Sequence, residues 1–187
     1  MSKRKITREQ LDKVLKNHLE WVNRKSYDDE KGKANLSETD LRGFDLSSVN
    51  LCYANLSGTD LRNTNLSKAN LCHANFSNAI LNGASLRNAN LCDANLSCAI
   101  LFNASLCNAN LSRADLYKTS FYFANLCGAK LANANMYKTN LQFANLAEAN
   151  LNMANINRTN FNSANLTSKR LKETSAELLN ALIKYQI

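Results

Sequence analysis

An apolar side chain stands at every fifth position of this sequence, from Leu36 to Leu166, without one insertion or deletion. Of these 27 positions, 22 are Leu, and the exceptions are Phe76, Phe121, Met136, Ile156 and Phe161. The residue two places earlier is Ala or Thr except at Phe44 and Val49, and the residue between is usually Asn or Asp. A step of five residues turns an α-helix by about 140° and alternates between the two faces of a strand. Neither a single helix nor a straight strand can therefore bury this pattern.

The small residue and the Leu of each unit suit a short extended segment in which both side chains point inward and Asn points outward. The other two residues must then turn a corner, so that the next Leu also points inward. Like residues recur every 20 positions, as in Ile80 and Ile100, Tyr117 and Tyr137, Phe123 and Phe143, and the series Cys52, Cys72 and Cys92. Twenty residues are four units, so the sequence predicts an all-β solenoid of four-sided coils. The 27 units make about 6.75 such coils.

Runs such as Ala34-Asn35-Leu36 and Ala89-Asn90-Leu91 resemble the units of pentapeptide-repeat proteins, and the likeness extends over residues 34–168. The resemblance implies a right-handed quadrilateral parallel β-helix. It also implies two properties of some relatives. In one group a C-terminal helix pairs two subunits end to end. In another, the protein binds DNA gyrase or topoisomerase IV and protects the enzyme from quinolones.

The two ends of the chain lie outside the repeat and are expected to cap it, since a solenoid otherwise exposes its core and strand edges. Thr7-x-x-Gln10 is a capping box for a helix over 8–24, within an N-terminal helical cap of residues 1–33. Thr174-x-x-Glu177 precedes a second helix over about 175–185, within residues 169–187. Its apolar residues form either a lid or a dimer contact: Leu178, Leu179, Leu182 and Ile183.

Several large apolar side chains fall on one side of the predicted coil. We call this set the apolar strip: Ile80, Ile100, Phe102, Tyr122, Phe123 and Phe143. Asn would be the ordinary residue at the two Ile positions. Contiguous exposed apolar area marks partner sites, so one interpretation is a protein-binding surface. The other is an aromatic ladder that only stabilises stacked coils.

A second side carries the cysteine column Cys52, Cys72 and Cys92, with His73 and Asp93 beside it. Such residues can form a zinc site or an activated nucleophile. Cys52 and Cys92, however, should lie about 10 Å apart across two strand spacings, and the side is flat. We therefore expect no catalytic residue, no cofactor and no metal. His18 is interpreted as a residue of the N-terminal helix near the cap.

A third side combines aromatic and basic residues: Tyr117, Lys118, Tyr137, Lys138 and Arg158. This composition can bind phosphates or single strands, but solvated decoration or a subunit contact explains it as well. The net charge is +8. Residues 34–168 carry nine Lys and Arg against seven Asp and Glu, so most of the excess lies at the ends. We expect no direct binding of nucleic acid, because a clustered basic stripe is lacking.

The basic N-terminus is followed by no apolar segment typical of a signal peptide, and no apolar run approaches the roughly 20 residues that span a bilayer. We expect a cytoplasmic protein with reduced thiols. The leading functional hypothesis is a non-catalytic scaffold or protein-interaction module, which binds another protein or a second copy of itself. The alternative is a gyrase-binding protein. The resemblance implies that such relatives imitate the width and negative charge of duplex DNA, and the near-neutral repeat disfavours this alternative because it lacks that negative charge. An enzyme or metal protein using the cysteine column is the third hypothesis.

Overall fold

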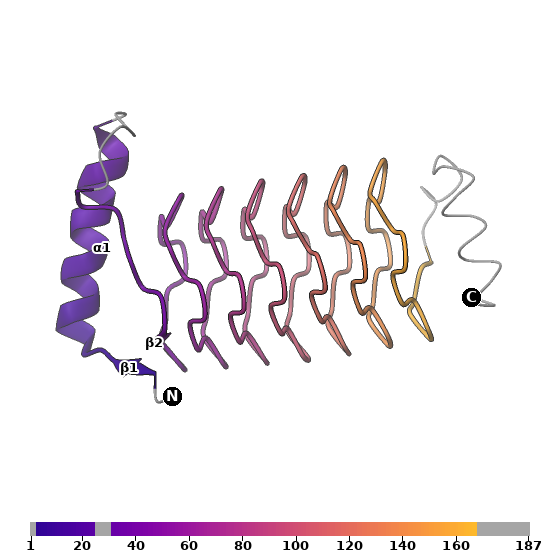
Figure 1. Ribbon diagram of the computed structural model, residues 1–187, viewed down its shortest axis with the longest axis horizontal. Helices are drawn as coiled ribbons and strands as arrows, with labels where there is room; N and C mark the ends of the chain where they lie inside the picture. The colour runs from indigo at the N-terminus through magenta and orange to yellow at the C-terminus, as the bar shows by residue number, and fades with distance from the viewer. Residues whose placement is uncertain (1–2, 25–30, 168–187) are drawn as a thin grey trace.

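A computed structural model describes residues 3–24 and 31–167, and it contains a rod of stacked coils with one helix across its N-terminal end (Figure 1). The elements follow the order β1 (Arg4–Lys5), α1 (Arg8–Asn23) and β2 (Thr39–Asp40). Beyond the two-residue strand β2, the described residues form no further strand of two or more residues. Each five-residue unit instead contributes one bridging residue to a ladder.

Parallel bridges connect each rung to the residue 20 positions later, from Asn35 with Asn55 to Asn145 with Asn165. The backbone bonds alternate in direction. Leu36 N–H donates to the Asn55 carbonyl at 2.8 Å, and Asn55 N–H donates to the Ala34 carbonyl at 2.9 Å. This is the pairing of parallel strands. One coil is therefore 20 residues, or four units, as the columns of like residues predict.

The repeated apolar side chains form a continuous core along the inside of the rod. Leu36, Phe76 and Phe121 are fully buried, and so is the small Ala of most units. Buried Thr residues replace Ala where a hydroxyl can be satisfied. Thr59 Oγ1 donates to the Leu36 carbonyl at 2.8 Å, and Thr119 Oγ1 donates to the Leu96 carbonyl at 2.7 Å. A buried hydroxyl is tolerated because it makes this hydrogen bond.

The outward Asn residues link the coils through their side chains. Asn75 is typical, since its Oδ1 accepts the Ser77 N–H at 3.0 Å and its Nδ2 donates to Asn55 Oδ1 at 3.5 Å. The corner residue two places after each Leu has positive φ, between 53° and 66° at 22 residues other than Gly. Asn and Gly accept this left-handed conformation more readily than other residues. Their frequent occurrence at corners follows from it.

Helix α1 begins after Thr7, which makes a capping box with Gln10. It covers the first coil with buried Leu11 and Trp21, while Val14 and Leu15 pack partly buried against the core. Phe44 and Val49, the larger residues at the Ala position, are partly buried against the same core. Hydrophobic packing of this kind shields the core from solvent at the N-terminal end of the solenoid.

Strand β1 pairs in parallel with β2, Arg4 with Thr39 and Lys5 with Asp40, and so extends the ladder beyond the first coil. The sequence predicted only a helical cap over residues 1–33, because a two-residue strand has no periodicity. His18 also has a role that its type did not indicate. It is fully buried, and its Nδ1 accepts the N–H of Ala34, the first residue of the repeat, at 3.0 Å. Burial lowers the pKa of His18.

The predicted C-terminal helix over about 175–185, with Leu178, Leu179, Leu182 and Ile183, lies outside the described residues. Within the described residues, no helix has the length and apolar character that crossing a membrane requires.

Candidate functional site

The apolar strip lies where its spacing places it, on consecutive coils of one side. Ile80 and Ile100 form a parallel β-bridge, and the aromatic rings of the following coils contact one another. Phe102 stacks on Tyr122 at 6.0 Å between centroids, and Phe123 stacks on Phe143 at 4.9 Å. Tyr122 connects these pairs, because its ring centroid is 4.7 Å from that of Phe123, with the two rings nearly perpendicular. The strip is therefore one connected surface.

This surface is open to solvent to an extent that is unusual for such residues. The exposed fraction is 44% for Ile100, 44% for Phe102, 48% for Phe123 and 39% for Phe143. Ile80 and Tyr122 are half-buried. Helix α1 packs on the N-terminal end of the rod, on the first coil, whereas the strip begins in a later coil, at Ile80 (Figure 1).

The two Ile residues take outward positions that are polar in the adjoining coils, where Asp60 and Ser120 stand. An Asn at Ile100 would accept the N–H of Phe102 through its own Oδ1, as Asn75 accepts that of Ser77. Here the Phe102 N–H donates instead to Oδ1 of Asn82, in the preceding coil, at 3.3 Å. The Phe102 N–H therefore keeps a hydrogen-bond acceptor although the outward position is apolar.

Two of the aromatic residues occupy corner positions. Phe123 has φ 59° and Phe143 has φ 58°. A bulky aromatic residue in the left-handed region is strained, whereas Asn63, Asn103 and Asn133 meet the same requirement easily.

The same side is charged nearer the N-terminus. Arg42 donates to both carboxylate oxygens of Asp40, and Arg62 donates to both oxygens of Asp60. The hydrogen bonds from Arg42 hold the pKa of Asp40 at about 2, and those from Arg62 lower the pKa of Asp60. Along the rod this side therefore changes from ion pairs to apolar rings.

The cysteine column is also present, but its thiols are not activated. Cys52 is buried, and Cys72 and Cys92 are half-buried. Burial raises the pKa of both Cys72 and Cys92 to about 11. A nucleophilic cysteine needs a lowered pKa, so these thiols are poorly suited to nucleophilic catalysis.

The sequence placed His73 and Asp93 beside the thiols, but the expectation of no metal was based on the distance between Cys52 and Cys92, and a smaller group on this side is closer together. Ligand atoms of Cys72, His73 and Asp93 all lie within 4.8 Å of one another. His73 Nε2 is 3.9 Å from Asp93 Oδ2, and the His73 ring stacks on Tyr53 at 4.6 Å. The sequence signal for this group is the adjacent pair Cys72 and His73, together with Asp93, which stands 20 positions after His73 and therefore one coil later.

Arg113 completes this group from the next coil. It donates to Asp93 Oδ1 at 2.7 Å and to Oδ2 at 2.6 Å, and its Nη2 lies 3.1 Å from Cys92 Sγ. The Cys92 thiol in turn donates to Asp93 Oδ2 at 3.1 Å. These bonds from Arg113 hold the pKa of Asp93 at about 2, so the carboxylate is ionised.

The third predicted cluster forms a regular ladder on another side. Tyr117 and Tyr137 stack at 6.0 Å. Lys118 lies over the Tyr117 ring at 5.0 Å, and Lys138 and Arg158 lie over Tyr137 at 5.3 and 5.8 Å. Cation–π contacts of this kind occupy the basic groups with their own aromatic neighbours.

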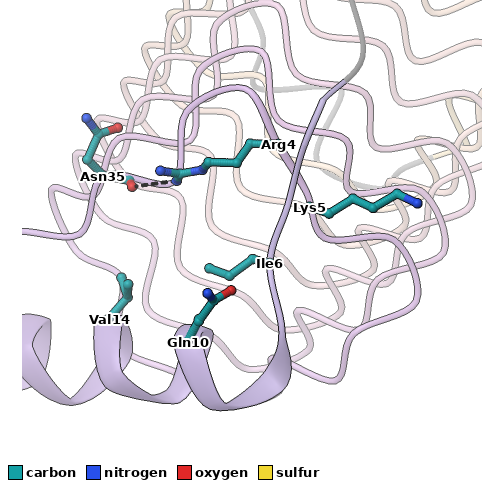
Figure 2. A pocket seen from close by; sticks show the side chains of 6 residues that line it. All are labelled: Arg4, Lys5, Ile6, Gln10, Val14 and Asn35. Carbon is teal, nitrogen blue, oxygen red and sulfur yellow. Dashed lines mark hydrogen bonds between the residues drawn. The ribbon is translucent and has the colours of Figure 1, made fainter.

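A pocket of 260 Å³ lies between β1, α1 and the first coil (Figure 2). Arg4 is tied there by its own contacts, because its Nη2 donates to the Asn35 carbonyl at 3.3 Å and to Thr39 Oγ1 at 2.9 Å. The lining residues are Arg4, Lys5, Ile6, Gln10, Val14 and Asn35. The pocket thus lies at the junction of the cap with the first coil.

Comparison with known proteins agrees with this fold. The pentapeptide-repeat family model matches in eight copies, over residues 33–67, 60–97, 69–106, 94–133 and 134–168. The chain belongs to the pentapeptide-repeat family. No curated protein matches its sequence.

Several solved structures are similar to this chain. HetL from the cyanobacterium Nostoc sp. strain PCC 7120, a pentapeptide-repeat protein involved in heterocyst differentiation regulation, is 25% identical. The match covers 72% of this chain and 90% of HetL, with a TM-score of 0.24. Rfr23 from the cyanobacterium Cyanothece 51142 is 24% identical over 73% of this chain and 87% of its own, with a TM-score of 0.37. QnrB1, a plasmid-mediated fluoroquinolone resistance protein, is 16% identical over 80% and 88%, with a TM-score of 0.35.

Proposed function

We propose that this protein is a non-catalytic binding module, and that a partner protein packs on the apolar strip. The observation that carries the proposal is the exposed, stacked pair Phe123 and Phe143, held at corners with positive φ. Large aromatic residues at the centre of an exposed apolar surface are typical of residues that dominate protein–protein binding.

Stability alone does not explain the pair. One aromatic stack contributes about 0.5–1.5 kcal/mol beyond burial. A strained left-handed conformation costs about 1–3 kcal/mol for each of the two residues. The stack therefore does not exceed the strain, and Asn at both corners would avoid it. Other corners also hold residues other than Asn and Gly at this φ, and what distinguishes Phe123 and Phe143 is that both rings are exposed and belong to one connected apolar surface.

A crosslinking experiment tests the proposal directly. A photoreactive phenylalanine analogue at Phe102 should crosslink one defined protein in cells, and at Tyr137, in the Tyr/Lys ladder on another side, it should not. Phe123→Asn and Phe143→Asn should abolish the Phe102 crosslink. Equal crosslinking at the two positions, or a crosslink that survives both substitutions, would refute the assignment of this surface.

The gyrase-binding alternative is not favoured by the charge of the described coils. Asp40, Asp60 and Asp93 are each paired with an arginine, which leaves little of the negative field that a DNA duplex presents. A gyrase supercoiling assay with and without a quinolone checks this alternative, and we expect neither inhibition nor protection. The cytoplasmic location and the end-to-end dimer stay predictions.

A further inference from the structure

Three side chains from two neighbouring coils converge on the side of the cysteine column. Cys72 and His73 follow Leu71, and Asp93 occupies the same corner as His73 one coil later. The thiol, the imidazole and the carboxylate offer one ligand atom each, and these atoms lie within 4.8 Å of one another. The side chains are half-buried or exposed, so a small ion has access to them.

We propose that Cys72, His73 and Asp93 form an open binding site for a divalent zinc ion. Sulfur, imidazole nitrogen and carboxylate oxygen are the three ligand types that zinc takes in proteins. Three protein ligands leave the fourth tetrahedral position to water. The assignment is independent of the apolar strip, which lies on a different side of the coil.

The geometry needs only a small contraction. In a tetrahedral zinc site with bonds of about 2.0–2.3 Å, neighbouring ligand atoms lie roughly 3.5 Å apart. His73 Nε2 and Asp93 Oδ2 are already 3.9 Å apart. Rotation about the side-chain bonds of Cys72 and Asp93 supplies the rest, since the ladder holds the backbone of both coils in place.

The imidazole is positioned before any ion binds. The His73 ring stacks on Tyr53 at 4.6 Å with an interplanar angle of 7°. The Tyr53 ring in turn contacts Trp21 of helix α1 in a T-shaped arrangement, with 6.2 Å between ring centroids. A ligand whose ring is already oriented loses less conformational freedom on binding. The cap and the site are thus in contact through one aromatic residue.

Arg113 opposes the ion. It occupies both oxygens of Asp93, and its positive charge lies beside the site. One thiolate and one carboxylate neutralise a divalent ion, so the guanidinium adds a net repulsion. Arg113→Asn should therefore tighten zinc binding. Asn is suited to this corner, where Arg113 has φ 59°.

The test uses the full-length reduced protein, with zinc measured by isothermal titration calorimetry and cobalt as a spectroscopic probe. We expect one ion per chain and a near-ultraviolet thiolate-to-cobalt charge-transfer band. His73→Asn and Cys72→Ser should each weaken zinc binding by at least about tenfold, the smallest loss seen when even an outer partner of a metal ligand is removed.

Both substitutions have precedents in this chain. Asn133 occupies the corner of His73 three coils later, and Ser112 occupies the column position of Cys72 two coils later. Cys127→Ser is the matched control, because Cys127 is equally half-buried but is followed by Gly128. Circular dichroism verifies that each variant is folded. The absence of a cobalt–thiolate band, or equal zinc affinity in wild type, Cys72→Ser and His73→Asn, would overturn the proposal.

Discussion

The rings of Phe123 and Phe143 lie parallel, 4.9 Å apart at an interplanar angle of 11°, although both residues have a left-handed backbone. The stack and the strain arise from the same corner position in adjacent coils. A residue that accepts positive φ more readily would remove both. This relationship makes the contribution of the pair to stability small, and it leads to a direct test.

The double variant Phe123→Asn, Phe143→Asn should keep its free energy of unfolding within about 1 kcal/mol of wild type. The lost stack of about 0.5–1.5 kcal/mol is offset by relief of strain at two corners. Urea unfolding followed by circular dichroism measures the change. Phe121→Ala is the control inside the same coil, and it should cost about 3–5 kcal/mol because Phe121 is fully buried. A comparable loss in the double Asn variant would mean that the rings act as a structural ladder.

The variant Ile80→Asn, Ile100→Asn should be as stable as wild type or more stable. The two amides can bond to each other between coils, as Asn75 and Asn55 do, and the amide at position 80 can accept the N–H of Asn82, as Asn75 accepts that of Ser77. Each such hydrogen bond contributes about 0.5–1.5 kcal/mol. The thermal midpoint is the measurement. A lower midpoint would show that the half-exposed Ile side chains stabilise the coil.

Acid should destabilise the N-terminal coils through Asp40 and Asp60. The folded-state pKa of Asp40 is about 2, and that of Asp60 is lowered from 3.8, so both favour folding when ionised. Their contribution is present above pH 3.8 and is lost as the pH falls from about 4 towards 2. Unfolding by urea over this range measures the slope. Asp60→Asn should flatten the slope, and Asn is the ordinary residue at this position. An unchanged slope would contradict the assignment.

Stability of the cap should also depend on pH near neutrality through His18. Burial lowers its folded-state pKa below the ordinary value of 6.5. Neutral His18 therefore stabilises the fold above pH 6.5, and this contribution decreases as the pH falls below that value. Protonation would also remove Nδ1 as the acceptor for the Ala34 N–H. Hydrogen exchange at the Ala34 amide should accelerate between pH 7.5 and 5.5, after correction for the intrinsic rate.

His18→Phe serves as the control for that experiment. It cannot titrate, so protection of Ala34 should no longer depend on pH. Overall stability should fall by about 1–3 kcal/mol, because the Ala34 N–H loses its partner in a buried place. A wild-type amide whose corrected exchange rate stays constant across the range would exclude His18 as the titrating group.

The regular part of the fold was predictable because the information repeats. The five-residue period places Leu inside, and the 20-residue columns identify which residues stack, such as Ile80 on Ile100. The capping box of Thr7 and Gln10 marks the start of α1. The pairing of β1 with β2 was not predictable, because Arg4 and Lys5 have no pattern and owe their conformation to the edge of the first coil.

The sequence alone determined the coil, the core and the residues of the apolar strip. The five-residue period defines the core, and the 20-residue period defines the coil and the residues that share a side. Only the tertiary structure decided what depends on side-chain direction. It shows that the rings of the strip are exposed, that His18 is buried against Ala34, and that Cys72 and His73 face Asp93. The physical reason is that periodicity specifies which residues are neighbours between coils. The direction of each side chain depends on local backbone angles and on contacts from other elements, such as the ring of Tyr53 and the guanidinium of Arg113.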